Sequence, residues 1–205
     1  MNITWLGHAC FLVQAGGYGI VLDPYTDVPG YRPLQAAGQQ VLCSHHHFDH
    51  DHLKSVALLP WEGESPFTVE TMDTYHDDQR GALRGENRVH ILRAEGLTVV
   101  HLGDLGHSLT KEQAARLRGC DALLLPVGGT YTIGPEEARQ VAEDIRPRVI
   151  LPMHYRRGGL GFAELSPLEE FLALYEPEQV RFLPGDTLTL TKETEAQVAV
   201  PLYRA

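Results

Sequence analysis

The sequence has few cysteines, no long apolar run and fewer basic than acidic residues, and each shortage excludes a class of protein. No apolar run approaches the ~20 residues of a membrane-spanning helix, and the first residues lack the basic and apolar segments of a signal peptide. Three cysteines lie far apart without a CxxC pair, at Cys10, Cys43 and Cys120. This pattern argues against disulfides or a zinc–thiolate site and predicts free thiols in a reducing, cytoplasmic compartment.

The charge balance excludes the usual nucleic-acid binders. Asp and Glu number 27 against 17 Lys and Arg, which gives a formal net charge of −10. Because nucleic-acid binders normally carry a basic face, we expect a small-molecule substrate and neither nucleic acid nor membrane as partner. Two bound divalent ions would add about four positive charges at one point, so the protein could still attract an anion there. The sequence leaves homo-oligomerisation open.

Length and composition predict one soluble domain, 1–205. The chain has 205 residues, of which 43% are apolar. A chain of this length buries roughly 70% of the surface that it would expose when unfolded. Short apolar runs between turns predict strands in the first half, with one helical stretch at 52–59. The expected strands are 3–6, 11–14, 20–22, 41–43, 67–71, 88–93 and 97–102.

Strands and helices alternate in the second half of the chain. Thr110 is a candidate helix N-cap, and Pro135 stands at the first position of another helix. The expected helices are 110–117, 135–145 and 166–174, and the expected strands are 122–127, 149–151, 179–183 and 187–191. This order predicts sheets covered by outer helices.

Histidines concentrate in one short segment, 44–52, with the sequence SHHHFDHDH. It holds five of the eleven histidines together with two aspartates. Imidazole and carboxylate groups suit zinc, manganese, iron and related ions, so the segment predicts a metal site. His45 and His47 are two residues apart and face the same side of an extended chain. Asp49 and His50 are adjacent, so both can face one site only if the chain has left the strand by then.

Single aspartates or histidines also follow five of the expected strands. Strand ends are where a sheet can bring ligands together at one rim. We therefore expect these side chains to converge on the same site. They are Asp23, His45, His76, Asp104 and His154.

The segment 45–50 has the form HxHxDH, and the chain resembles the metallo-β-lactamase superfamily over most of its length. The other features of the resemblance are Asp23-Pro24, His76, Gly103-Asp104 and the segment PMHY at 152–155. WLGHACF near the start, GGTYT at 128–132 and PMHY are similar to the branch that contains ascorbate-6-phosphate lactonase. The resemblance implies an α/β (α+β) fold, a four-layer αββα sandwich, and metal-dependent hydrolysis.

The resemblance also implies the ligands of two divalent ions. They are His45, His47 and His76 for one ion, Asp49, His50 and His154 for the other, and Asp104 as the bridge. Such ligands hold ions ~3.5–4 Å apart and leave positions open for a bridging hydroxide and the substrate. Zn²⁺ is the first expectation, and Mn²⁺, Fe²⁺ and Ni²⁺ also suit these ligands.

Three other histidines leave an alternative for one ligand. His90, His101 or His107 could take the place of His76. His101 lies three residues from Asp104 in an extended run, so the two side chains should point to opposite faces. His107 could instead line the pocket as a proton donor.

Several polar residues near the motif are expected outside the metal shell. His46 and His52 should point away from the ions, and Asp51 is a candidate helix N-cap. His8 is either a structural hydrogen-bonding residue or a wall of the pocket. By resemblance, Asp23 orients the metal ligands from behind, and a plain Asp-Pro turn is the alternative.

We predict hydrolysis of an ester, lactone or phosphodiester bond in a small, anionic metabolite. Asp49 would also accept a proton from the bridging water, and His107 would protonate the leaving group. Arginines flank the motifs, and with Tyr131 they could bind the anionic group; the candidates are Arg80, Arg84 and Arg156. The alternatives are a redox di-iron protein and a metal-binding protein without turnover. In the flavo-diiron relatives a Glu stands in place of His47, which favours hydrolysis over redox chemistry.

Overall fold

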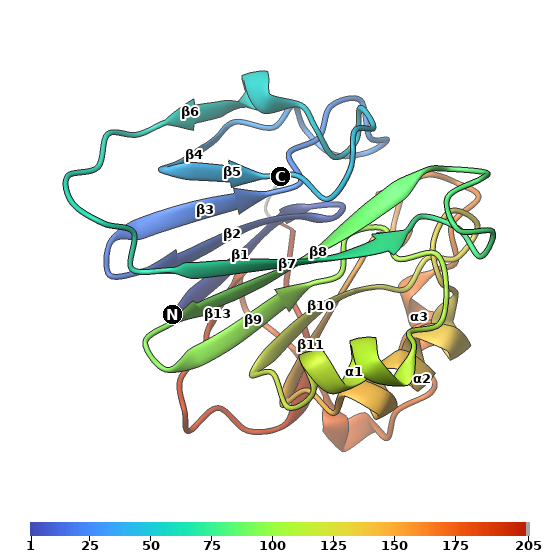
Figure 1. Ribbon diagram of the computed structural model, residues 1–205. Helices are drawn as coiled ribbons and strands as arrows, with labels where there is room; N and C mark the ends of the chain where they lie inside the picture. Colours follow the sequence, from blue (N-terminus) through green and yellow to red (C-terminus); the bar gives the residue numbers. More distant parts are fainter. Residues whose placement is uncertain (204–205) are drawn as a thin grey trace.

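Two β-sheets lie face to face around a shared core in the computed structural model, which describes residues 1–203 (Figure 1). The first sheet has five strands in the order β13-β1-β2-β3-β5. Their bounds are β1 (Asn2–Gly7), β2 (Cys10–Ala15), β3 (Tyr18–Leu22), β5 (Gln40–Leu42) and β13 (Thr187–Thr189). Apolar side chains that lie opposite one another on neighbouring strands stabilise this sheet. Trp5 pairs with Phe11, which pairs with Leu22, and all three side chains are buried in the core.

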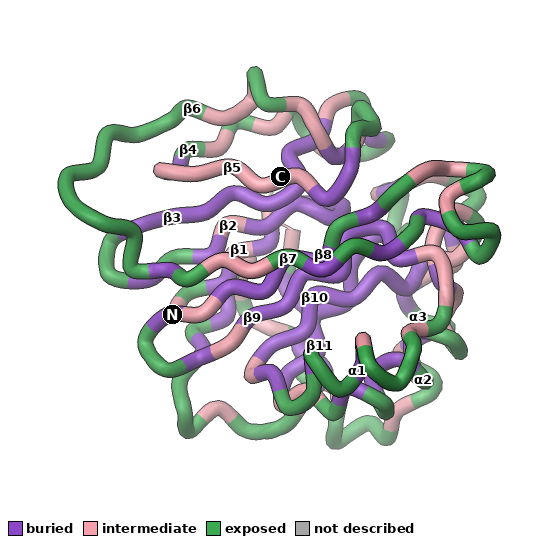
Figure 2. The backbone as a smooth tube through the Cα atoms, in the orientation of Figure 1, coloured by how far each residue is buried: buried purple, intermediate pink, exposed green. Residues whose placement is uncertain are grey.

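The second sheet has seven strands in the order β12-β14-β11-β10-β9-β8-β7. Its antiparallel part comprises β7 (Thr68–Tyr75), β8 (Glu86–Ala94) and β9 (Leu97–His101). Its parallel part adds β10 (Ala122–Pro126), β11 (Val149–Met153), β12 (Val180–Phe182) and β14 (Gln197–Val200). All residues of β10 and β11 are buried, because the first sheet covers one face and helices cover the other (Figures 1 and 2).

Helices α1 (Lys111–Leu117), α2 (Pro135–Ile145) and α3 (Leu168–Leu172) form the outer layer over the second sheet (Figure 1). Local signals define the first two. The Thr110 hydroxyl accepts a hydrogen bond from the Gln113 amide, and the Gln113 side chain accepts one from the Thr110 amide. Pro135 begins α2 as expected, and α2 ends at Ile145, followed by the capping residue Arg146 in the left-handed conformation.

The outer face of the first sheet is covered without an α-helix. A second apolar cluster, formed by Cys10, Val21, Tyr25 and Val28, lies there. The segment 25–36 and the two-stranded pair of β4 (Ala36–Gly38) and β6 (Val56–Leu58) pack against it. Among the described residues, the fourth layer is therefore built from turns and a short two-stranded pair, so the helical layer that the αββα prediction placed on this face is replaced by irregular chain.

The expected helix at 52–59 is wrong. Only a 3₁₀ turn, Leu53–Ser55, forms there, and the chain then pairs with β4 in parallel. Val56 lies opposite Ala36 and packs on the second cluster, so tertiary pairing supplies the backbone bonds that a helix would have made internally. The strand pair formed by β4 and β6 was not predicted, nor was the strand β14. The helix expected at 166–174 is shorter than predicted and spans Leu168–Leu172. No helix among residues 1–203 has the length and apolar character to cross a membrane.

The contact between the chain after β10 and the chain after β11 gives a test of the fold. A Cβ atom on Gly128 would lie 1.9 Å from the carbonyl oxygen of His154. Because backbone cannot move aside as a flexible side chain can, we expect Gly128→Ala to lower the free energy of unfolding by about 1–3 kcal/mol in urea denaturation.

Gly134→Ala is the matched control for Gly128→Ala. The nearest atom to its added Cβ, a side-chain oxygen of Glu137, lies 3.9 Å away. We expect it to cost less than about 1 kcal/mol, the scale of N-cap changes. Equal stabilities of the two variants would contradict the close approach of the chains after β10 and β11.

Candidate metal centre

The C-terminal ends of six strands bring polar side chains together at one rim of the two sheets. Each strand stops where its next residues turn inward, and these side chains are at most 7% exposed. The residues are His8 after β1, Asp23 after β3, His45 after β5, His76 after β7, Asp104 after β9 and His154 after β11. The predicted convergence at strand ends is thus what the structure contains.

The Asp104 carboxylate lies at the centre of the cluster. Its Oδ2 atom is 3.2 Å from Nε2 of His76 and 3.2 Å from Nε2 of His154. Nε2 of His50 lies 3.3 Å from the same oxygen, and Nε2 of His45 lies 4.0 Å from it. Asp104 therefore stands between two sets of imidazoles, as a bridging ligand would.

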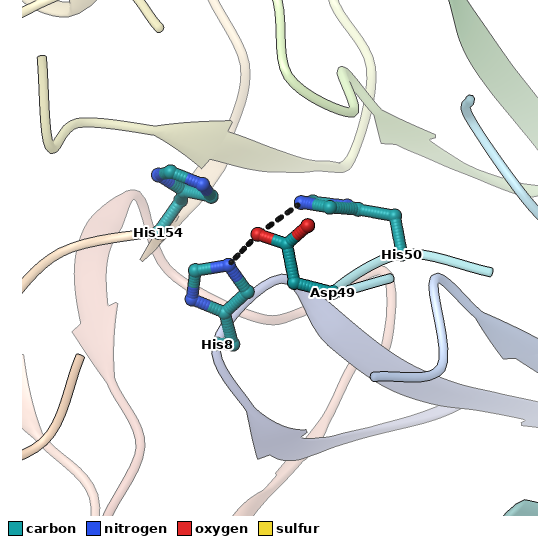
Figure 3. Close-up of side chains that lie close together, drawn as sticks. All are labelled: His8, Asp49, His50 and His154. Carbon is teal, nitrogen blue, oxygen red and sulfur yellow. Dashed lines mark hydrogen bonds and ion pairs between the residues drawn. The ribbon is translucent and has the colours of Figure 1, made fainter. Parts of the chain in front are cut away.

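One set consists of His45, His47 and His76, and the other of His8, Asp49, His50 and His154 (Figure 3). Within each set, the candidate ligand atoms lie within 4.8 Å of one another. The first set contains the three residues expected for one ion. The second contains the three expected for the other ion, together with His8.

A turn within the histidine-rich loop orients its side chains. The amides of His50 and Asp51 both donate to the carbonyl oxygen of His47 at 2.9 Å, so the chain leaves the extended conformation there. Asp49 and His50 consequently face the cluster together. His46 points outward: its side chain is 89% exposed and pairs with Asp51 at 2.6 Å. Asp51 does not cap a helix, because its carboxylate is bound to His46 and to the Cys43 thiol.

Asp23 and Ser44 fix which nitrogens of two ligands face the cluster. The Asp23 carboxylate accepts hydrogen bonds from the Ser44 amide at 2.7 Å, the Ser44 hydroxyl at 2.6 Å and His50 Nδ1 at 2.8 Å. Since the Ser44 hydroxyl donates to Asp23, its oxygen accepts from His45 Nδ1 at 2.9 Å. The Nε2 atoms of His45 and His50 are thus directed at the cluster, which is the arrangement that a metal requires.

Unpartnered atoms test whether these residues suit a metal ion. Nε2 of His45, Nε2 of His50 and Oδ1 of Asp104 are buried and have no hydrogen-bond partner among residues 1–203. Leaving such groups unpaired is costly, and the two nitrogens both lie within 4.0 Å of the other Asp104 oxygen, Oδ2. A set of imidazole nitrogens and carboxylate oxygens of this kind fits divalent ions such as Zn²⁺.

The electrostatics of the cluster favour a cation. Burial alone would raise the pKa of Asp104, but His154 and His50 outweigh it and hold the pKa well below its usual value. Burial would lower the pKa of His50, but the carboxylates of Asp104 and Asp23 raise it well above its usual value, so without a metal ion the ring carries a second proton, which a bound cation would displace. Burial and His50 lower the pKa of His45 to about 3, so that ring is neutral at pH 7 and able to bind a metal.

His8 is part of the second set. Of its two predicted roles, structural hydrogen bonding or lining the pocket, the structure shows the hydrogen bond. His8 has a left-handed backbone with φ of 51°, and its ring lies 4.3 Å from that of His154 (Figure 3). Its Nε2 lies 3.3 Å from Asp49 Oδ2. Burial and the neighbouring His154 lower the pKa of His8 to about 4, so it approaches Asp49 as a neutral donor at pH 7.

The alternatives to His76 are engaged elsewhere. His101 Nδ1 accepts from the Gly103 amide at 3.1 Å, and its Nε2 donates to the carbonyl of Ala9 at 2.9 Å. His90 Nε2 contacts the carbonyl of Cys43 at 3.1 Å.

The structure does not bring His107 to the cluster. Its Nε2 accepts from the Tyr75 amide at 3.2 Å, and its Nδ1 donates to the carbonyl of Ser108 at 2.8 Å. With both nitrogens used in the turn and no place in the cavity wall, His107 is not positioned as the expected proton donor.

A cavity of about 530 Å³ opens over the metal-ligand cluster. Of the arginines expected there, only Arg84 lines it. Arg80 is exposed outside it, and Arg156 donates through Nε to the carbonyl of Leu165 at 2.6 Å. Tyr131 lines the cavity as expected, with its hydroxyl bound to Glu164 at 2.6 Å.

Two residues that support the site were not predicted. Asn87, which is 1% exposed, donates to Thr74 and to the Leu102 carbonyl and accepts from the Asp104 amide at 2.9 Å. Asp77 accepts from four amides, of Gln79, Gly81, Leu83 and Arg84. Burial opposes the ionised form, but these amides lower the pKa of Asp77 to about 2. A single Asn or Asp after a ligand carries no recognisable motif, so the sequence offers no signal for either.

Known proteins resemble this chain over most of its length. A model of the beta-lactamase superfamily domain matches residues 2–154. A UPF0173 protein of Pyrococcus furiosus is 34% identical over 213 residues, which cover 91% of this chain and 96% of the relative. A UPF0173 metal-dependent hydrolase of Pyrobaculum neutrophilum is 28% identical and covers 93% of this chain and 100% of its own.

Solved structures agree with these matches. A crystal structure from Thermotoga maritima, described as a candidate Zn-dependent hydrolase of the metallo-β-lactamase superfamily, has a TM-score of 0.78 and 36% identity and covers 99% of both chains. A metallo hydrolase of Ignicoccus hospitalis has a TM-score of 0.66 at 22% identity, covering 94% of this chain and 99% of its own, and thus shares the fold.

The sheet sandwich with histidines and aspartates at its strand ends defines the class of metal-dependent hydrolases of β-lactamase type. The chain belongs to the metallo-β-lactamase superfamily. The predicted superfamily, the mixed α/β fold class and the expectation of a metal-dependent hydrolase are therefore confirmed.

Asp23 gives a test of the bonds behind the metal ligands. Asp23→Asn keeps the shape of the side chain but removes the charge that accepts from His50 and Ser44. We expect the affinity for Zn²⁺, measured by chelator competition, to fall about 10–100-fold. The control is Asp27→Asn, at an exposed position with φ of 55° that asparagine tolerates, and its affinity should be unchanged. Equal affinities of the two variants would contradict the role of Asp23.

Proposed function

We propose that the protein is a binuclear metal-dependent hydrolase that cleaves an ester, lactone or phosphodiester bond of a small substrate. The observation that supports this is the position of Asp104 between two ligand sets. The ligands of one ion would be His45, His47 and His76, those of the other Asp49, His50 and His154, and Asp104 would be shared.

The residues around the ligands account for how hydrolysis would proceed. When bound, two divalent ions supply a hydroxide nucleophile at neutral pH and polarise the scissile carbonyl or phosphoryl oxygen. Asp49 lines the cavity, and a hydrogen bond from His8 to its Oδ2 holds the carboxylate in place. Burial would raise the pKa of Asp49, but His8 and His50 lower it, so Asp49 is ionised at neutral pH, as a group that accepts a proton from water must be.

The metal that we propose first is Zn²⁺, with Mn²⁺, Fe²⁺ and Ni²⁺ as the other ions that suit the donor set. Five of the seven ligands are imidazoles, and imidazole with carboxylate suits all four ions. The hydrolytic proposal is favoured over a redox di-iron centre because a histidine, His47, stands in the first ligand set.

The cavity wall supports a small substrate with an anionic group. Arg84 borders the cavity above the ring of Tyr131, at 5.7 Å from its centroid, and would pair with that group. The acidic net charge of −10 supports a small-molecule partner over nucleic acid, and the free thiols of Cys10, Cys43 and Cys120 support a cytoplasmic protein.

Metal content tests the binuclear assignment. Elemental analysis should give two metal ions per chain in the wild type and one in His76→Ala, because the variant loses a ligand of only one ion. The control is His52→Ala, which changes a histidine of the same loop outside both ligand sets and should keep two ions.

Metal removal tests the hydrolysis itself. Complete chelation should abolish hydrolysis of ester, lactone and phosphodiester panels, and added Zn²⁺ or Mn²⁺ should restore it. A single ion per wild-type chain would exclude the binuclear site, and activity that survives chelation would exclude metal catalysis.

A further inference from the structure

Three aromatic side chains form one wall of the cavity over the metal-ligand cluster. Phe48, Tyr131 and Phe162 all line it. The ring of Phe162 lies edge-on to both others, with centroids 6.3 Å from Phe48 and 6.5 Å from Tyr131. It also lies 5.8 Å from the ring of His8, so the wall reaches down to the second ligand set.

This aromatic wall is exposed to solvent at its rim. The side chain of Phe48 is 57% exposed, although its neighbours His47 and Asp49 face the cluster. Water against an aromatic ring is unfavourable, and a ring of this size gains substantially from being covered. A flat apolar group that enters the cavity would cover Phe48 and Phe162 and lie beside the reacting atoms.

The wall is held in place by the backbone. The amide of Gly161 donates to the carbonyl of Pro29 at 2.9 Å, and a Cβ atom on Gly30 would lie 2.1 Å from the carbonyl oxygen of Gly159. The Thr130 hydroxyl donates to the carbonyl of Glu164 at 2.7 Å. Because these contacts fix the backbone that carries Tyr131 and Phe162 before a ligand arrives, binding needs little ordering of that part of the wall.

Apart from the metal ligands, the charged residues that line the cavity are Arg84 and Glu164, and their charges offset each other. Arg84 donates to the carbonyl of Thr130 at 3.1 Å, and Glu164 borders the same cavity, bound to the Tyr131 hydroxyl. Apart from the metal ligands, Arg84 is the one guanidinium among the described residues that lines the cavity, and Glu164 offsets its charge, so the protein adds little beyond the ions to hold a dianionic phosphate. Arg80 and Arg156, which would have added positive charge, lie outside the cavity.

We propose that the substrate carries a flat apolar group, such as an aryl ring, on the acyl side within a few bonds of the scissile bond, with at most one negative charge. This inference rests on the proposed hydrolase function. The cleavage is ordinary hydrolysis: a water oxygen bonds to the acyl carbon, the bond to the leaving oxygen breaks, and that oxygen takes a proton.

Two methyl esters of similar intrinsic reactivity test the proposal. The metal-loaded protein should hydrolyse methyl 3-phenylpropanoate with a kcat/KM about tenfold or more above that of methyl propanoate, the size expected for covering one ring. A phosphorylated analogue, methyl 3-(phosphonooxy)propanoate, should be no better than methyl propanoate. Equal rates for the two uncharged esters, or a preference for the phosphorylated ester, would overturn the proposal.

Variants of the wall identify the cause of the preference. Phe162→Ala should remove most of the tenfold preference for the phenyl ester, and Phe162→Leu should remove part of it, with metal content unchanged in both. Phe182→Ala is the control, because Phe182 is 56% exposed on β12, outside the cavity lining, and its removal should leave the preference intact. A preference that persists in Phe162→Ala would overturn the role of the wall.

A binding measurement separates this proposal from the hydrolase function. Calorimetry with the products should give tighter binding of 3-phenylpropanoate than of propanoate to the wild type, and equal binding to Phe162→Ala. If neither ester reacts, the ester form of the proposed function fails, while the binding difference still supports the aromatic subsite. If both esters react equally and both products bind equally, the hydrolase function stands and the aromatic subsite is excluded.

Discussion

A buried carboxylate needs positive charge around it, and much of this structure can be understood from how that need is met at Asp104. The residue is 2% exposed, and four imidazole Nε2 atoms lie within 4.0 Å of its Oδ2. Without metal ions, only part of the cluster can be protonated, and the remaining neutral imidazoles turn lone pairs toward one another and toward the carboxylate, which is unfavourable at close range. Divalent cations between them would satisfy both kinds of group, so the donor set accounts for the metal dependence of the superfamily.

The two sheets position these metal-ligand side chains. Each ligand-bearing strand ends at the same rim, and the core between the sheets keeps the strand ends fixed. Bonds behind the ligands then set their orientation: Asp23 and Ser44 turn the rings of His45 and His50, and Asn87 holds the amide of Asp104. The ligands are therefore positioned by packed strands and by buried hydrogen bonds, and the loops over the rim supply the cavity wall.

Local sequence signals predicted two of the helices and the side chains that converge at the metal-ligand cluster. The capping residue Thr110 and the start at Pro135 are local features, and the helices at these positions have the expected bounds within one residue. The HxHxDH spacing and the residues after strands predicted which side chains would meet. By contrast, 52–59 forms β6 because of a partner, β4, that is remote in the sequence, and no local pattern contains that information.

The residues around the metal ligands were less predictable, because their positions also depend on contacts between segments that are remote in the sequence. Arg80 and Arg84 look alike in the sequence, but the amide bonds to Asp77 fold their loop so that only Arg84 borders the cavity. His107 follows the Asp104 turn, but two backbone contacts hold it away. Phe162 lies far along the chain from the histidine-rich loop, so its place beside Phe48 follows only from the fold.

Two cations around Asp104 are central to the proposed function, and anomalous diffraction from crystals of the purified protein grown with Zn²⁺ tests for them directly. We predict two anomalous peaks at the zinc edge, one among His45, His47 and His76, the other among Asp49, His50 and His154, with Asp104 in contact with both. A single peak, or peaks that do not contact Asp104, would contradict the binuclear site.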